Sequence, residues 1–180
     1  KAALGRIDAL LDAGADIEWQ HKGAGRTPRR SAVIARKRDA AARLLDRGAN
    51  IEHACRALGY TALGWAAAHG DTEIGELLIA RGATLDPASP EQRRTPLMLA
   101  CAGGHLAMVE RLLDRGASVA PLDFQGRNAL AMADERGYAE VVALLPDAGA
   151  TPPPASMEAP PLAWPEPTAH RETAAVVLAS

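Results

Sequence analysis

The sequence predicts an all-α fold, a solenoid of stacked helix-turn-helix units joined by hairpin loops. Three observations predict it. Five segments resembling LLDRGA place a glycine at positions 14, 48, 82, 116 and 149. A helix-capping residue lies 21 positions before each of the last four glycines, at Thr27, Thr61, Thr95 and Asn128. Aromatic residues make up only 3% of the chain, so Ala, Leu, Val and Ile must fill a core between closely spaced helices.

The unit that ends at Gly116 shows why each repeat should contain two helices. Thr95 is a good N-cap, and Pro96 suits the first helical position because its missing N–H would be unpaired there. Gly103 ends this first helix, and apolar residues spaced along one face predict a second helix over residues 105–114. The stretch 117–127 contains turn-forming residues and predicts a hairpin. Helix, helix and hairpin therefore form one unit.

The repeats divide the chain into an array over residues 1–150 and a tail over residues 151–180. A partial repeat occupies residues 1–21 and supplies only a second helix; repeats of about 22–55, 56–89, 90–122 and 123–150 follow. Pro146 should interrupt the last helix. Seven prolines within residues 152–167 predict a Pro-rich linker or tail, and disorder is favoured over docking of its apolar end, Ala174 to Ala179.

These repeats resemble the ankyrin repeat family, and the strongest matches are TALGWAAAHG at 61–70 and TPLMLACAGGH at 95–105. Departures from the family pattern are visible. The hairpins within 14–27, 48–61 and 82–95 are one residue longer than the one within 116–128, so they should bulge or project. Arg29 and Arg30 stand where the family has Leu and His, and Arg36 stands where it has a helix-ending glycine. The first helix of this unit is therefore expected to depart from the family pattern.

The resemblance implies a protein–protein interaction module that binds its partner on the concave surface of hairpins and first helices. Aligning the repeats on the family places one column just before the helix caps, and Arg and Tyr are frequent hot-spot residues. An acidic or aromatic-rich protein partner is expected, while the alternative that these arginines are simply solvated stays open. The predicted partner-binding residues are Arg26, Tyr60, Arg94, Arg127, Phe124, Gln125, Gln92, Leu58, His69 and Arg136.

Charge leaves a second kind of partner open. The net charge of −2 argues against nucleic acid or a membrane surface as partner of the whole chain, but residues 1–50 carry 11 Lys and Arg against 6 Asp and Glu. Between Lys22 and Arg47 there are nine basic and two acidic residues. This run could bind nucleic acid or an acidic partner, but a solvated face is favoured because no aromatic residue interleaves it. Arg47, Arg81 and Arg115 lie at the carboxyl ends of second helices. Their positive charge interacts favourably with the helix dipole there, and this stabilising role is a simpler interpretation than partner binding.

No catalytic site, metal site or cofactor is predicted. His53 and Cys55 form an isolated pair without a second pair nearby, and the chain lacks a phosphate-binding loop and a nucleophile elbow. Cys55 and Cys101 do not require a disulfide, and no apolar stretch is long enough to span a membrane. Trp65 is expected to be wedged between repeats. A monomer in the cytoplasm is the simplest expectation.

Two functional classes follow. The favoured one is a free-standing adaptor that captures a protein ligand, without catalysis. The alternative is a regulatory or targeting fragment of a larger enzyme or effector whose active domain lies outside this chain.

Overall fold

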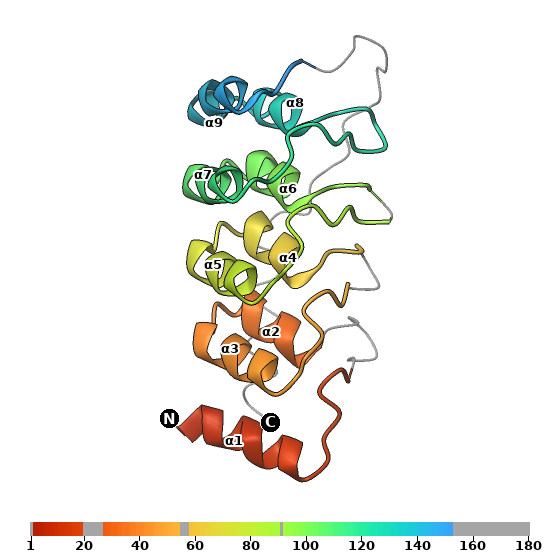
Figure 1. Cartoon of the computed structure of the whole chain (residues 1–180), viewed down its shortest axis with the longest axis vertical. Coiled ribbons are helices and arrows are strands. Elements are labelled where there is room, and N and C mark those ends of the chain that lie inside the picture. The colour runs from red at the N-terminus through yellow and green to blue at the C-terminus, as the bar shows by residue number, and fades with distance from the viewer. Residues whose placement is uncertain (1, 20–26, 55–57, 91, 153–180) are drawn as a thin grey trace.

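The computed structural model describes residues 2–19, 27–54, 58–90 and 92–152. Within these residues the chain forms nine α-helices and a short 3₁₀ helix, and it contains no strand. Helix α1 stands first, and four helix pairs follow it (Figure 1). The helices are α1 (Ala2–Asp12), α2 (Pro28–Ile34), α3 (Arg38–Asp46), α4 (Ala62–Ala68), α5 (Thr72–Ala80), α6 (Pro96–Ala102), α7 (Leu106–Asp114), α8 (Ala129–Asp134) and α9 (Ala139–Leu144).

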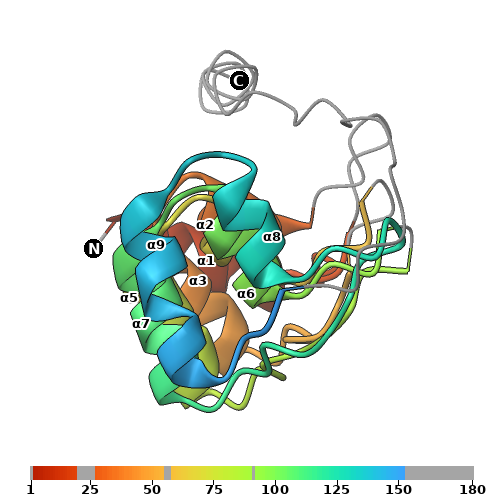
Figure 2. The same ribbon diagram turned by 90° about the horizontal axis from the view of Figure 1, so that it is seen from above.

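The helix pairs stack side by side, which confirms the all-α solenoid. The first helices α2, α4, α6 and α8 pack on one another in that order, and the second helices α1, α3, α5, α7 and α9 form a parallel row. Viewed along the stack in Figure 2, the second helices lie on one side, the first helices in the middle and the hairpins on the other side. The described parts of the hairpins therefore project in the same direction.

Side-chain caps start the first helices, as the sequence predicts. Thr27, Thr61 and Thr95 accept a hydrogen bond through their hydroxyl oxygen from the backbone N–H three residues later, at 3.3, 3.3 and 3.4 Å. The side chain of Asn128 does the same for Ala131 at 2.9 Å. Each cap satisfies one of the N–H groups that a helix start leaves without a partner. The capping residues that recur 21 positions before the repeat glycines thus mark where the first helices begin.

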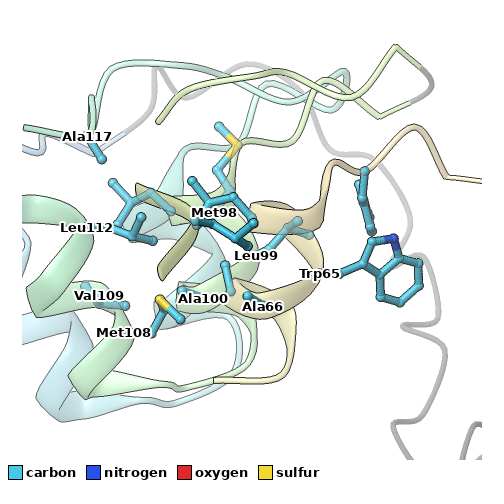
Figure 3. Packing of buried hydrophobic residues seen from close by; sticks show 14 of the residues in the cluster. Trp65, Ala66, Met98, Leu99, Ala100, Met108, Val109, Leu112 and Ala117 are labelled. Carbon is cyan, nitrogen blue, oxygen red and sulfur yellow. The ribbon is translucent and has the colours of Figure 1, made fainter. Parts of the chain in front are cut away.

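The core consists of small and aliphatic side chains. Ala66, Ala100 and Ala133 are fully buried where first helices face one another, and Leu78 and Leu112 are fully buried on second helices. Figure 3 shows part of this packing, in which Ala66 and Ala100 lie among the longer side chains of Met98, Leu99, Met108 and Leu112. Alanine permits close approach of the helix axes, and the longer side chains fill the space between the two rows.

Two ladders of polar contacts connect successive repeats. In the hairpins, the carboxylates of Glu18, Glu52 and Asp86 accept hydrogen bonds from the backbone N–H groups of the next hairpin, at 2.6, 2.7 and 3.1 Å. The donors are the backbone N–H groups of Asn50, Thr84 and Ser118, respectively. Because the spacing between partners is constant, the same contact recurs at each junction and fixes the register of the hairpins.

The second ladder joins the second helices. Arg47 forms ion pairs with Asp8 and Asp12, Arg81 with Asp46, and Arg115 with Glu76 at 2.6 Å. The sequence predicts that these arginines stabilise the helix dipole at the carboxyl ends of the second helices. The structure shows that each also pairs with a carboxylate of the preceding repeat. The pairs are partly exposed, so each adds little to the stability of the fold.

Helix α2 corrects one expectation. It is a regular helix of seven residues, the same length as α4 and α6, although Arg29 and Arg30 replace the expected Leu and His. Both side chains are buried, at 1% and 8% exposure, so the interpretation of the basic run as a solvated face is wrong for these two residues. They are accommodated because Arg29 donates hydrogen bonds to the carbonyl oxygens of Asn50 and His53, and Arg30 lies over the ring of Trp65.

The end of the array confirms the effect of Pro146. Helix α9 ends at Leu144, and residues Pro146–Ala148 form a 3₁₀ turn closed by Gly149. The predicted tail is described only through Pro152, so the segment from Ala174 to Ala179 lies outside the described residues.

Candidate protein-binding surface

The structure places the predicted binding residues in different environments. Phe124 is 47% exposed and Arg136 is exposed. Leu58, Gln92, Arg127 and His69 are half-buried, whereas Tyr60, Arg94 and Gln125 are buried. Arg26 lies outside the described residues. The column before the caps is therefore not a uniform exposed surface.

Tyr60 joins two neighbouring hairpins. Its hydroxyl donates a hydrogen bond of 2.7 Å to Oε1 of Gln92, and its ring meets the ring of Trp65 edge-on with 5.6 Å between centroids. Trp65 is only 5% exposed, which confirms that it is wedged between repeats. Tyr60 and Gln92 thus hold the second and third hairpins in a fixed relation.

Arg94 and Arg127 converge on one buried carboxylate. The side chain of Asp123 is fully buried; its Oδ2 lies 2.8 Å from a terminal nitrogen of Arg127 and 3.7 Å from Nε of Arg94. Arg127 also pairs with Glu135 at 3.0 Å. Because Arg94 is only 8% exposed, the alternative of a simply solvated arginine is wrong at this position. This cluster stiffens the fourth hairpin and links it to the third.

The turn of the third hairpin is one residue longer than that of the fourth and carries an exposed arginine. The backbone of Ser89 donates to Arg94 O across this turn, whereas Asp123 donates to Arg127 O across the shorter one, so one more residue is enclosed here. Arg93 occupies the place that Gly59 and Gly126 hold in the second and fourth hairpins, with φ at 54° against 65° and 76°, and its side chain is exposed. The prediction that this hairpin bulges is confirmed, and the exposed arginine is Arg93 rather than Arg94. The sequence signal for it is an arginine at the position where the second and fourth hairpins have Gly59 and Gly126.

The third and fourth hairpins contact each other near their tips. The backbone N–H of Phe124 donates to the carbonyl oxygen of Gln92 at 3.3 Å, so the aromatic ring and Arg93 belong to adjacent tips. Among the described residues the large hydrophobic side chains that are exposed are Leu10, Trp19 and Phe124. Two of these three are aromatic residues of hairpins.

His69 and Arg136 lie apart from the hairpins. They follow the carboxyl ends of α4 and α8, whereas the hairpins precede the amino ends of the first helices. The Nδ1–H of His69 faces the carbonyl oxygen of Trp65 at 2.9 Å. These two residues therefore belong to the row of turns between first and second helices.

A shallow depression lies between α2, α4 and the second hairpin. It is lined by Thr27, Arg29, Arg30, His53, Tyr60, Ala62 and Trp65, and these side chains leave no water-sized space in it. Burial lowers the pKa of Arg29, and the charges of Glu18 and Glu52 oppose this effect. The depression is thus a packed junction.

Reactive side chains are few in the described part of the chain. No three His, Cys, Asp or Glu residues gather there in a group that could hold a metal ion. Cys101 is buried, and burial raises the pKa of its thiol to about 12. Cys55 lies outside the described residues, so the predicted pair with His53 is untested. The described helices also include none with the length and apolar character needed to cross a bilayer.

A stack of helix pairs with all hairpins on one edge defines the class of helical repeat proteins. The family model described as ankyrin repeats (three copies) matches residues 2–89 and 83–153, and the chain belongs to this family. A search of curated proteins gave no match. Ankyrin repeats generally serve as protein–protein interaction modules and are typically non-catalytic.

Proposed function

We propose that this chain is an adaptor module that binds a protein segment with acidic and aromatic residues across the tips of its third and fourth hairpins. The observation that carries the proposal is the exposure of Phe124 beside Arg93 on two hairpins that are hydrogen-bonded to each other. We define the tip surface as Arg93, Phe124 and Gln92.

The residues beneath the tip surface favour binding because they hold it rigidly. Tyr60, Arg94 and Asp123 are buried and connect consecutive hairpins. A preorganised surface loses little conformational entropy when a partner binds. Tyr60, Arg94 and Asp123 thus support the surface from below, and a partner would touch the side chains at the tips.

The chemistry of the exposed tips indicates the partner. An exposed aromatic ring contributes a large apolar area, and an arginine can pair with a carboxylate or stack on a second ring. Arg127 is already neutralised by Asp123 and Glu135, so Arg93 supplies the available positive charge. The same surface would serve a free-standing adaptor or a targeting segment of a larger protein.

A selection experiment tests the proposal with short peptides in place of the natural partner. Peptides would be selected on the whole chain from a random displayed library, and the dissociation constant of one selected peptide would be measured by calorimetry. We expect Phe124→Ala and Arg93→Ala each to weaken binding about tenfold or more, as hot-spot substitutions do. Arg111→Ala is the matched control, because Arg111 is 60% exposed on a second helix. Equal affinities of all four proteins would refute the proposal.

A further inference from the structure

The turn between α2 and α3 carries three consecutive basic residues, Arg36, Lys37 and Arg38, which we call the basic turn. All three are exposed. The equivalent turns later in the array contain Gly70 and Asp71, Gly104 and His105, and Gly137 and Tyr138. Figure 2 shows these turns on the side of the stack away from the hairpins. The concentration of positive charge is therefore specific to one repeat.

The other described residues of the basic run have structural partners. Arg29 and Arg30 are buried against backbone carbonyl oxygens and the Trp65 ring, respectively. Arg43 pairs with Asp8 at 3.5 Å, and Arg47 pairs with the same carboxylate at 2.9 Å. Within the described part of this run, the charge left for a partner lies on the basic turn, whose acidic neighbours are Asp39 and Asp71, and Asp71 already pairs with Arg36.

The backbone of Arg36 adopts a conformation that is unfavourable for a residue other than glycine. Its φ is 54°, a value that suits glycine, and Gly70 and Gly104 have φ values of 64° and 67° at the corresponding places. Its Nε donates to Oδ2 of Asp71 at 3.0 Å, yet the side chain stays 67% exposed. One edge of the guanidinium is thus oriented by Asp71, while most of the side chain faces solvent.

We propose that the basic turn is a second docking point for the partner and takes an acidic peptide segment. This inference rests on the proposed function as a protein-binding module. Lys37 and Arg38 match one or two carboxylates, and the guanidinium of Arg36, which Asp71 orients through Nε, can bind a further one through its two terminal nitrogens. A nucleic acid is disfavoured because tight binding to phosphates requires more contacts than three, and the net charge of the chain is −2.

The test uses the whole chain and a fluorescently labelled peptide of eight glutamates at low salt. We expect the combined substitutions R36G, K37Q and R38Q to weaken binding at least tenfold. Glycine fits the backbone at position 36, but the variant loses the ion pair with buried Asp71, so binding is measured at a temperature at which circular dichroism shows both triple variants to be folded. The matched control is R81Q, R111Q and R115Q, which removes the same charge from second helices where Asp46 and Glu76 already neutralise the arginines. It should change binding less than threefold.

Three results would overturn the proposal: no detectable binding of the peptide, equal weakening in both triple variants, or tighter binding of a 20-base-pair DNA duplex that is lost with the basic turn. The proposed function is tested separately by the displayed-peptide selection and Phe124→Ala. Loss of affinity there, together with an unaffected triple variant of the basic turn here, would remove the second docking point and leave the first.

Discussion

The guanidinium carbon of Arg30 lies 4.4 Å from the centroid of the Trp65 ring, although the two residues belong to first helices of successive repeats. The stack buries both side chains and is flanked by Tyr60 and by His69, whose ring centroid is 5.7 Å from that of Trp65. A cation held over an indole face gains more when both groups are shielded from water. This junction therefore replaces apolar packing between α2 and α4 with a cation–π contact.

Trp65→Ala should lower the free energy of unfolding by about 3–5 kcal/mol, because it removes a large buried side chain and the partner of Arg30. Urea unfolding followed by circular dichroism measures the change. Trp19→Ala is the control, since Trp19 is 54% exposed, and it should cost less than about 1 kcal/mol. Similar losses in the two variants would contradict the assignment of Trp65 to the core.

Arg29→Ala should also destabilise the fold, by about 2–4 kcal/mol. The substitution leaves the carbonyl oxygens of Asn50 and His53 without their charged donor and opens a cavity at a residue that is 1% exposed. Chemical denaturation again provides the measurement. Arg38→Ala, at an exposed position, should change stability by less than about 0.5 kcal/mol. If Arg29→Ala lowered the free energy of unfolding as little as Arg38→Ala, the buried guanidinium of Arg29 would contribute nothing to the stability of the fold.

Gly104 and Gly116 have similar backbone conformations but different surroundings, with φ values of 67° and 87°. A Cβ at Gly104 would lie 2.6 Å from ring carbons of Tyr138, whereas nothing lies within 4 Å of one at Gly116. Gly116→Ala should therefore cost about 1 kcal/mol from backbone strain alone, and Gly104→Ala about 2–4 kcal/mol. Thermal unfolding compares the two.

A Tyr138→Ala background provides the control for this pair. With the ring removed, Gly104→Ala should cost no more than Gly116→Ala, because only the strain remains. An unchanged difference would show that the aromatic ring is not the obstacle.

The stability of the array should fall as the solution becomes mildly acidic, in part through His105. Its ring donates to the carbonyl oxygen of Ala68 at 3.0 Å, and burial lowers its pKa below the usual 6.5, with further lowering by the charges of His69 and Arg36. Above pH 6.5 both folded and unfolded imidazoles are neutral, so the contribution is fully present. Below that pH the unfolded chain takes up the proton first, and folding loses stability.

The comparison of wild type with His105→Gln isolates this contribution. The decrease in melting temperature from pH 7.5 to pH 5.5 should be larger in the wild type than in the variant. Glutamine removes some packing, but it does so at both pH values. Parallel decreases would exclude His105 as a source of the pH dependence.

The sequence by itself determined the repeat, the helices and their order. The spacing of glycines and the capping residues at Thr27, Thr61 and Thr95 act through hydrogen bonds within a few residues, so they can be recognised without a partner segment. The burial of Trp65 and the interruption at Pro146 also follow from local pattern and backbone chemistry.

The tertiary structure decided which polar residues are buried and which are exposed. Arg94 is covered because it faces the buried carboxylate of Asp123, while Arg93 is exposed at the turn position where the second and fourth hairpins have Gly59 and Gly126. Arg29 and Arg30 enter the interior because acceptors and an aromatic ring from the next repeat meet them there. Partners separated by a full repeat become neighbours only when the units stack, and that stacking geometry is set by side-chain packing across the whole array.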